Sequence, residues 1–352
     1  MAGTRGNAGP GARAAARRAW RPGRWGALAL ASASVTLTGC GSPPSSPGGG
    51  SAASAPGPGV TTRATSPAPP ASVATTAPPP PVTTTSTPPP DQAGWTAVYA
   101  APAGTVVDER TVTLPDGASV TVARFRAGMT RFELHVGSQD PPSAGTALPA
   151  ADASVVTSAE RAVLLAGFNG GFKASAGAGG FEVGGSVLLP LRAGLESFVI
   201  DSDGTAHVGS WQGGLPTPGE QVVAVRQNLG PLLADGAPSP TVTDVAAWGD
   251  TLGGVPNVAR SALGQDAGGD ILYAGSAHAL PSDMAQALVD AAATDAMELD
   301  INPEWVQLDL ASSPGGPLQA AVPGQYRPAD QYISGWTRDF VTVTAAPGSA
   351  GT

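Results

Sequence analysis

The sequence has a single cysteine, Cys40, among its 352 residues. A lone cysteine excludes an intramolecular disulfide, so any folded part of the chain must be held together by its core. Lysine is equally rare: Lys173 is the only one, beside 17 arginines. It directly follows an asparagine, two glycines and a phenylalanine.

Acidic residues are missing from the first quarter of the chain. No aspartate or glutamate precedes Asp91, whereas seven arginines do. Residues 91–352 therefore carry 27 acidic and 11 basic side chains, a net charge of −16. A domain this acidic repels polyanions, which argues against nucleic acid as a partner. An anionic substrate would need a local cluster of positive charge.

The N-terminus is typical of a targeting segment. Six arginines between Arg5 and Arg24 precede an apolar run over residues 25–38 that is too short to serve comfortably as a permanent transmembrane helix. The run ends in Leu37-Thr38-Gly39-Cys40, which resembles the lipobox of bacterial lipoproteins, where the cysteine is lipidated. We predict a signal peptide over residues 1–39, lipidation of Cys40 and an extracytoplasmic, membrane-anchored location. An ordinary signal peptide is the alternative.

A low-complexity segment follows Cys40. Residues 41–90 are almost entirely Gly, Pro, Ser, Thr, Ala and Val, a composition that cannot bury enough apolar surface to offset the entropy of ordering. We predict a disordered tether over residues 40–90. At roughly 3 Å per residue in polyproline conformation, it could reach on the order of 150 Å. Residues 91–352 would then form the folded domain.

Strand patterns dominate residues 91–352. Alternating apolar residues predict hairpins over residues 111–125 and 196–211, with turns at Pro115-Asp116-Gly117 and Asp203-Gly204. His135 and His207 are expected to be ordinary strand residues, His135 on the solvent side. Residues 151–161 predict a short helix, and Ser282 is expected to cap a longer one. The pattern predicts an α+β fold: a single mixed domain with a strand-rich sheet and few helices.

A glycine-rich turn follows a predicted buried strand at Asn169-Gly170-Gly171-Phe172. Such a turn can bring backbone N–H groups close to a ligand, although Asn-Gly is also a common hairpin turn. Three further elements come later in the chain: Gly230-Pro231 before a strand and Asp235-Gly236, the run Arg260-Ser261-Ala262-Leu263-Gly264, and a helix leading into Glu298-Leu299-Asp300.

In this order and spacing, residues 154–302 resemble the phosphodiester glycosidase family, the family of the uncovering enzyme, an N-acetylglucosamine-1-phosphodiester α-N-acetylglucosaminidase. The resemblance implies an envelope-anchored hydrolase that cleaves a sugar-1-phosphodiester in a cell-surface glycan or glycolipid. The chain departs from the last family motif, Asn-Leu-Asp-Gly-Gly-Gly-Ser, because it reads Glu298-Leu299-Asp300-Ile301-Asn302-Pro303. The change removes backbone N–H groups that the glycines could offer to a phosphate.

Glu298 and Asp300 are the predicted catalytic residues. On one strand they would share a face, and their repulsion would raise the pKa of one of them, as general acid–base catalysis on a glycoside requires. A calcium site is the alternative use of these acids, with Asn302 and Glu304 as further oxygen ligands. No other cofactor is predicted.

The predicted substrate-binding residues surround this pair. Arg260 would grip an anionic oxygen, because guanidinium is always charged and binds in bidentate fashion. Lys173 would lie at the mouth of the site, and His278 at its rim. The full set is Asn169, Gly170, Gly171, Lys173, Arg260 and Ser261.

A non-catalytic lipoprotein that binds a glycan is the rival prediction. In that case Trp305 and Trp248 would serve as platforms for sugar rings. A solute-binding protein of a transporter is disfavoured, because it would show repeated strand–helix alternation and the sequence predicts one convincing helix. The oligomeric state is not predicted.

Overall fold

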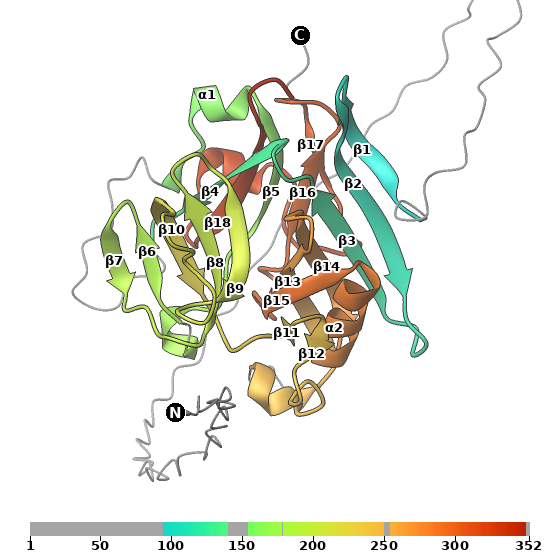
Figure 1. Ribbon diagram of the computed structural model, residues 1–352. Helices are drawn as coiled ribbons and strands as arrows, with labels where there is room; N and C mark the ends of the chain where they lie inside the picture. Colours follow the sequence, from blue (N-terminus) through green and yellow to red (C-terminus); the bar gives the residue numbers. More distant parts are fainter. Residues whose placement is uncertain (1–93, 140–153, 178, 250–253, 350–352) are drawn as a thin grey trace, which may run out of the picture. The chain divides into compact units, whose positions relative to one another are not determined.

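The computed structural model describes residues 94–139, 154–177, 179–249 and 254–349 (Figure 1). They belong to the second of two compact units of the chain, Val82–Thr352. The predicted signal peptide, lipidated Cys40 and tether lie outside the described residues, as do residues 151–153 of the predicted short helix.

Eighteen strands form three antiparallel sheets. The first sheet has the order β1-β2-β3-β14-β13-β15-β11-β12. Its strands are β1 (Thr96–Ala101), β2 (Gly104–Thr113), β3 (Ser119–Phe125), β11 (Leu233–Ala234), β12 (Ala237–Pro238), β13 (Val258–Asp266), β14 (Ile271–Ala279) and β15 (Ala293–Glu298).

The other two sheets have five strands each. The second has the order β7-β6-β10-β8-β9 and the third β17-β16-β5-β18-β4. The strands of the second are β6 (Phe181–Val183), β7 (Ser186–Leu189), β8 (Glu196–Asp201), β9 (Ala206–Ser210) and β10 (Val222–Gln227). Those of the third are β4 (Thr130–His135), β5 (Leu164–Asn169), β16 (Leu308–Ala311), β17 (Leu318–Ala320) and β18 (Phe340–Ala345).

Helices are few, and the α+β prediction is wrong: the fold is mostly β. The described residues hold two α-helices, α1 (Ser158–Arg161) and α2 (Pro281–Asp290), and three 3₁₀ turns, η3 (Ala174–Ala176), η4 (Val245–Trp248) and η6 (Gln331–Ser334). Antiparallel neighbours can be joined by short turns and need no helical crossover. The sequence therefore folds into sheets with α2 as a single addition, and not into a layer of helices on a sheet.

Neither described helix is both long enough and apolar enough to cross a bilayer.

The predicted hairpins are confirmed. β2 pairs with β3 across the 114–118 turn, and β8 pairs with β9 across the turn at Gly204. The sequence shows these turns directly, because each contains a glycine with a positive φ angle, 90° at Gly117 and 81° at Gly204, a conformation that glycine adopts readily.

The cap of α2 differs from the prediction. The helix begins one residue before Ser282, at Pro281, with Leu280 as its N-cap. The Asp283 carboxylate reaches back and accepts a hydrogen bond from the Leu280 N–H at 2.7 Å. Proline is well suited to the first helical position because it has no N–H to satisfy there. Asp283, and not Ser282, therefore completes the start of this helix.

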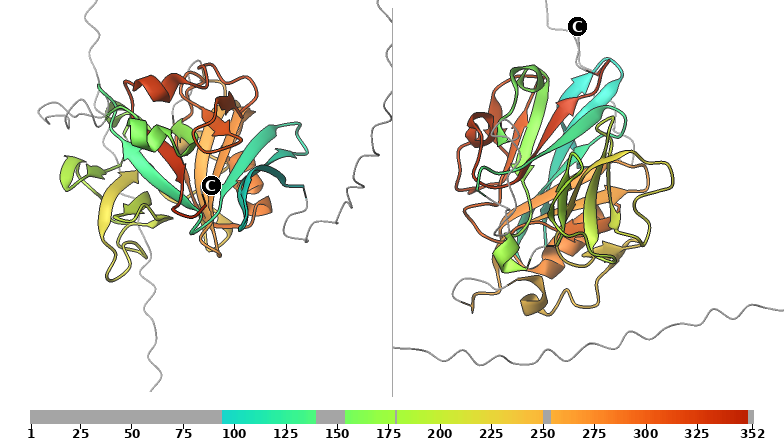
Figure 2. Two further views of the ribbon diagram at one scale, coloured as in Figure 1. Left: turned by 90° about the horizontal axis from the view of Figure 1, so that it is seen from above. Right: turned by 90° about the vertical axis from the view of Figure 1, so that its left-hand side faces the viewer.

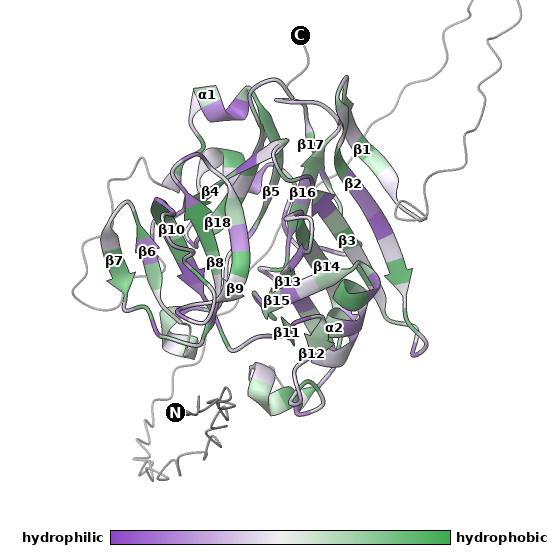
Figure 3. Cartoon of the chain, viewed as in Figure 1, coloured by the Kyte–Doolittle hydropathy of each residue, from purple (hydrophilic) through white to green (hydrophobic). Residues whose placement is uncertain are grey.

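The core has two main parts. The larger one is shared by all three sheets and includes Phe125 from the first, Phe198 from the second and Phe168 from the third. The smaller one lies between α2 and the outer side of the first sheet. The strands carry the apolar residues that form these cores (Figure 3), and Figure 2 shows the sheets from two further directions.

His135 does not lie on the solvent side as predicted; its exposed fraction is 2%. Its Nε2 is 2.9 Å from Glu160 Oε1, and its ring stacks on Phe340 with 4.5 Å between centroids. Glu160 of α1 covers His135, while Glu133, on the same face of β4, stays exposed.

Candidate functional site

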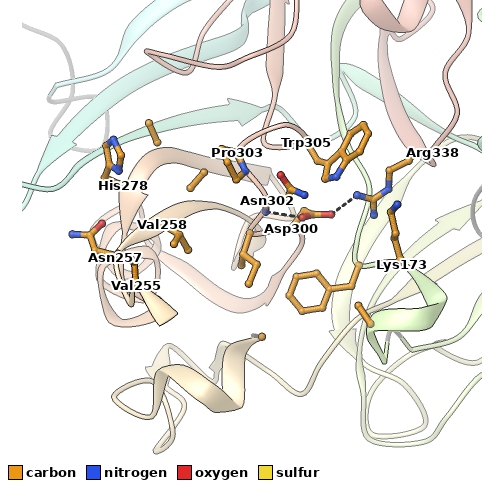
Figure 4. A pocket seen from close by; sticks show the side chains of 16 residues that line it. Lys173, Val255, Asn257, Val258, His278, Asp300, Asn302, Pro303, Trp305 and Arg338 are labelled. Carbon is orange, nitrogen blue, oxygen red and sulfur yellow. Dashed lines mark hydrogen bonds and ion pairs between the residues drawn. The ribbon is translucent and has the colours of Figure 1, made fainter. Parts of the chain in front are cut away.

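A pocket of about 480 Å³ opens near the end of β15, between β13 and β14 of the first sheet and the residues that follow β5 of the third. Figure 4 shows Asp300 at its centre, with Lys173 and Arg338 on one side and Asn257 and His278 on the other. Its sixteen lining residues are Phe172, Lys173, Ala176, Gly249, Val255, Asn257, Val258, Ala259, Ala277, His278, Asp300, Ile301, Asn302, Pro303, Trp305 and Arg338. Most of them are apolar, so the few charged groups dominate its chemistry.

Asn169, the last residue of β5, joins the β5 turn to the strand β13. Its amide Nδ2 donates to Ser261 Oγ at 2.9 Å, and its Oδ1 accepts from the Tyr273 hydroxyl at 2.8 Å. Ser261 in turn donates its N–H to the Asp300 carbonyl at 2.9 Å. The structure thus brings Asn169, Ser261 and Asp300 together, with Asn169 and Ser261 buried. Asn169, Arg260 and Asp300 were expected to line one cleft, but of these three only Asp300 lines the pocket.

The two glycines after Asn169 are required by close approach. A Cβ at Gly170 would fall within the carboxyl group of Asp339 and 2.8 Å from its carbonyl oxygen. A Cβ at Gly171 would lie 3.1 Å from the guanidinium of Arg226. Neither glycine has a positive φ, so space, and not backbone conformation, fixes the residue type here.

The backbone N–H groups of this turn bind protein and not a ligand, in contrast to the expected ligand-facing arrangement. Gly170 N–H donates to the Asp339 carbonyl, Gly171 N–H to Asp339 Oδ2 and Phe172 N–H to Asn228 Oδ1 at 3.1 Å. The turn is therefore a buried scaffold that holds Phe172 and Lys173 at the pocket.

Asp300 is the acid of the pocket, and Arg338 is its partner. Arg338 Nη1 donates to Asp300 Oδ2 at 2.8 Å, and Nη2 to the Gly171 carbonyl at 2.7 Å. The other carboxylate oxygen, Oδ1, accepts from the Asn302 N–H at 2.9 Å. Burial raises the pKa of Asp300, and the positive charge of Arg338 partly opposes the rise.

Glu298 and Asp300 have separate partners, so they do not form the predicted carboxylate pair. β15 ends at Glu298, whose Oε1 lies 2.5 Å from Arg260 Nη1. Burial raises the pKa of Glu298 to about 8, against the opposing effect of Arg260, and the charge of Asp300 adds to the rise. The two acids are coupled through space, but Glu298 is not among the lining residues.

Arg260 is fully buried and does not line the pocket. Neighbouring residues on a strand point to opposite faces, so Arg260 lies on the other side of β13 from Ser261. There its Nε donates to the Ala279 carbonyl at 3.0 Å, and Nη1 to the Trp248 carbonyl at 3.2 Å. The place at the pocket that the sequence assigned to Arg260 is taken by Arg338.

Positive charge and an aromatic ring form one wall of the pocket. Lys173 is exposed, and its Nζ lies 5.7 Å from the centre of the Trp305 ring. The guanidinium carbon of Arg338 lies 4.9 Å from the same centre. The wall thus combines two cations with an apolar ring face in a domain whose net charge is negative.

The calcium alternative receives no geometric support. Asn302 Oδ1 accepts from the Glu304 N–H at 3.0 Å, and the Glu304 carboxylate pairs with Arg327 at 3.0 Å. These oxygens thus already serve a turn and an ion pair, and the calcium site stays a prediction.

Of the remaining candidates, His278 lies at the pocket and Trp248 does not. His278 is exposed and lines the rim as expected. Trp248 is 3% exposed, and its indole N–H donates to the Thr241 carbonyl at 2.9 Å, which excludes it as a sugar platform. Trp305 lines the pocket and could still serve as a platform for a sugar ring.

The sequence interpretation missed Arg338, Asp339, Arg226 and Asn228. Arg226 Nε donates to Asp339 Oδ2 at 2.7 Å, and Nη2 to the Phe172 carbonyl at 2.6 Å. Arg-Asp just before the last strand, and Arg-Gln-Asn at the end of β10, were the available signals, because charged residues at the ends of buried strands need partners.

Comparisons with known proteins give weak likenesses. No protein-family model matches the chain, and no curated protein matches it. Among solved structures, the catalytic domain of zebrafish N-acetylglucosamine-1-phosphodiester α-N-acetylglucosaminidase, auto-inhibited by its pro-peptide, is 16% identical, with a TM-score of 0.42 over 71% of this chain and 87% of that one.

Two further structures are similar to a comparable extent. A hypothetical protein from Synechocystis is 13% identical, with a TM-score of 0.40 over 68% of this chain and 62% of that one. A Burkholderia pseudomallei protein described as exported is 13% identical, with a TM-score of 0.35 over 68% and 75%. At these scores, the likenesses assign no activity, substrate or location to this chain.

Proposed function

We propose that the pocket binds a sugar-1-phosphodiester and hydrolyses the bond between the sugar and the phosphate. The observation that carries the proposal is the meeting of Asp300, Arg338, Lys173 and Trp305 at one apolar pocket. An indole face suits the apolar face of a sugar ring, and the Lys173 cation suits a phosphate. The carboxylate then lies where it can act on the bond between them.

A single carboxylate is sufficient for this substrate class. Among the described residues that line the pocket, Asp300 is the only acid. Ordinary glycosides need a second carboxylic acid to protonate the leaving oxygen. A phosphate monoester, with a second pKa of about 6, can leave as an anion at pH 7 without that proton. Lys173 would stabilise its charge as the bond breaks, while Arg338 stays with Asp300 and orients that carboxylate.

Asp300 would act as a general base on water. Its exposed fraction is 4%, so a water molecule can reach it more readily than the anomeric carbon of a sugar. The raised pKa of Asp300 makes its carboxylate a stronger base once ionised. Attack by an activated water on the face opposite the phosphate predicts inversion at the anomeric carbon.

Glycan binding without turnover is the second candidate. It is favoured by the position of Glu298, which is paired with Arg260 and leaves no second acid at the pocket. Trp305 and Lys173 would then bind a phosphorylated sugar that is not cleaved.

Anchoring at the cell envelope belongs to the same proposal. The lipobox-like residues 37–40 and the low-complexity residues 41–90 support a domain held outside the cell by a lipidated Cys40 on a long tether. Membrane retention that is lost in Cys40→Ala would support it.

Turnover is the test. The protein is incubated with a panel of sugar-1-phosphodiesters, and the released sugar and its anomeric configuration are followed by NMR. Asp300→Asn should lower kcat by about 10²–10⁴-fold, the usual contribution of general acid–base catalysis, while substrate binding is retained. Glu304→Gln, an acid-to-amide change four residues away on an exposed side chain, is the matched control and should keep wild-type turnover.

Two outcomes would contradict the enzyme. Turnover that persists in Asp300→Asn would remove Asp300 from the chemistry. A wild type that binds the panel without cleaving it would establish the binding protein instead.

A further inference from the structure

A second group of polar side chains lies on the second sheet, away from the pocket. Asp201 ends β8, His207 lies in β9, and Glu220 comes just before β10. One ligand atom of each lies within 4.8 Å of the other two. His207 Nε2 is 3.9 Å from Asp201 Oδ2 and 3.9 Å from Glu220 Oε1. None of the three lines the pocket described above.

The fold brings these residues together from three segments. Val199 is paired directly with His207, so Asp201, two residues along β8, lies diagonally across from His207 on the same face. The 211–221 segment then folds over this face, because Leu215 packs with Val199 and Val225. That packing carries Glu220 to the other side of the imidazole.

The separations within the group are wider than a hydrogen bond, which leaves room for an ion between the side chains. At 3.9 Å, the imidazole nitrogen is beyond hydrogen-bond distance of either carboxylate. A Zn²⁺ ion binds nitrogen and oxygen at about 2.0–2.2 Å, which places its ligand atoms roughly 3–3.5 Å apart. The two distances from His207, 3.9 Å each, exceed that spacing by about 0.4–0.9 Å, so the side chains would have to close by that amount around an ion.

The other His–carboxylate group of the described residues provides a contrast. There, His135 Nε2 lies 2.9 Å from Glu160 Oε1 and 3.0 Å from Thr342 Oγ1. Its polar atoms satisfy one another directly, and no room is left between them. The two groups have similar composition, but the one around His207 is open.

An unsatisfied oxygen adds independent support. Asp201 Oδ1 is buried and has no hydrogen-bond partner, which is costly for a carboxylate unless a cation is present. Glu220 itself is held by the N–H and hydroxyl of Thr217, so its orientation is fixed from outside the group.

We propose that Asp201, His207 and Glu220 bind one Zn²⁺ ion, with water as the fourth ligand. One imidazole and two carboxylates match the donors that zinc takes, whereas Ca²⁺ requires six to eight oxygens and this group cannot supply them. The side chain of His207 is 27% exposed, which gives the ion a path from solvent. The ion would fasten the 211–221 segment to the β8–β9 hairpin. This site is independent of the proposed hydrolysis.

Zinc binding is measured by competition with a chromophoric chelator on the full chain carrying Cys40→Ser, so that the thiol does not contribute. We expect one Zn²⁺ per chain. His207→Gln and Glu220→Gln should each weaken binding at least tenfold, while His278→Gln, the same change at the pocket histidine, should leave the affinity within twofold of the parent.

The melting temperature provides the second measurement. Zn²⁺ should raise it in the parent and in His278→Gln, and should have no effect in His207→Gln, while Ca²⁺ should have no effect in any of the three. The proposal is overturned if the parent takes up no zinc, or if His207→Gln binds zinc as tightly as the parent. If His207→Gln fails to fold, Glu220→Gln decides by the same criteria.

Discussion

At residue 170 the chain has no room for a side chain. Gly170→Ala would place a methyl group inside the Asp339 carboxyl group, so Asp339 and its ion pair with Arg226 must move. We expect the free energy of unfolding to fall by about 1–3 kcal/mol, the usual cost of overpacking. Gly230→Ala, at another motif glycine with nothing within 4 Å of its Cβ position, should change it by less than about 0.5 kcal/mol. Equal melting temperatures for the two variants would contradict this account.

Single residues also show which parts of the site could be predicted from the sequence. Asn169, Ser261 and Asp300 were recognisable from their motifs and are brought together by the fold. Arg260 was assigned to the wrong side of β13, because a motif gives residue order but not the direction in which a side chain leaves a strand. Arg338 was missed because its partner Asp300 is 38 residues away and no local pattern connects them.

Among the elements, α2 depends on the acid of its first turn. Asp283→Ala removes the acceptor of the Leu280 N–H, and we expect a loss of about 0.5–2 kcal/mol in the free energy of unfolding. Ser282→Ala, one residue earlier in the same turn, should cost less than about 0.5 kcal/mol. Chemical denaturation measures the loss in the free energy of unfolding for both variants. If Ser282 capped the helix, as the sequence predicted, Ser282→Ala would cost more than Asp283→Ala.

Hairpins were predictable and sheets were not. β8 and β9 are joined by a turn that the sequence shows directly, and so are β2 and β3. In contrast, β14 pairs with β3, and β18 pairs with β4 and β5, across roughly 150–200 residues. Such pairings are decided by how apolar faces of distant strands fit, and alternation within one strand does not reveal its neighbours.

For the whole molecule, buried acids predict stability that falls as the pH rises. Burial raises the pKa of Glu196 to about 8, and the charge of Asp295 adds to the rise. Between the ordinary value of about 4.5 and 8, the folded state holds a proton that the unfolded state has released, so unfolding becomes easier with each unit of pH. Glu298, at about 8, and Asp309, at about 7, act in the same direction.

Glu196→Gln should remove one part of this dependence. The amide stays neutral, so the decline in the free energy of unfolding between pH 5 and 8 should become shallower by up to about 1.4 kcal/mol per pH unit. The melting temperature at pH 8 should exceed that of the wild type. Glu182→Gln, on the partly exposed strand β6 of the same sheet, is the control and should keep the wild-type slope. A Glu196→Gln profile parallel to that of the wild type would contradict the prediction.

The position of β18 in the third sheet determines when that sheet can form during synthesis. This strand follows all the other strands of the described domain in the sequence, yet it lies between β4 and β5. Arg338 and Asp339, which hold Asp300 and the 169–172 turn, come immediately before it. A ribosome has therefore made nearly the whole domain before the third sheet can close, and until then the open edges of β4 and β5 need protection from other chains. A nascent chain that stops short of residue 338 would contain the acid of the pocket but not the groups that hold it, so the site can form only after residues 338 and 339 have been made.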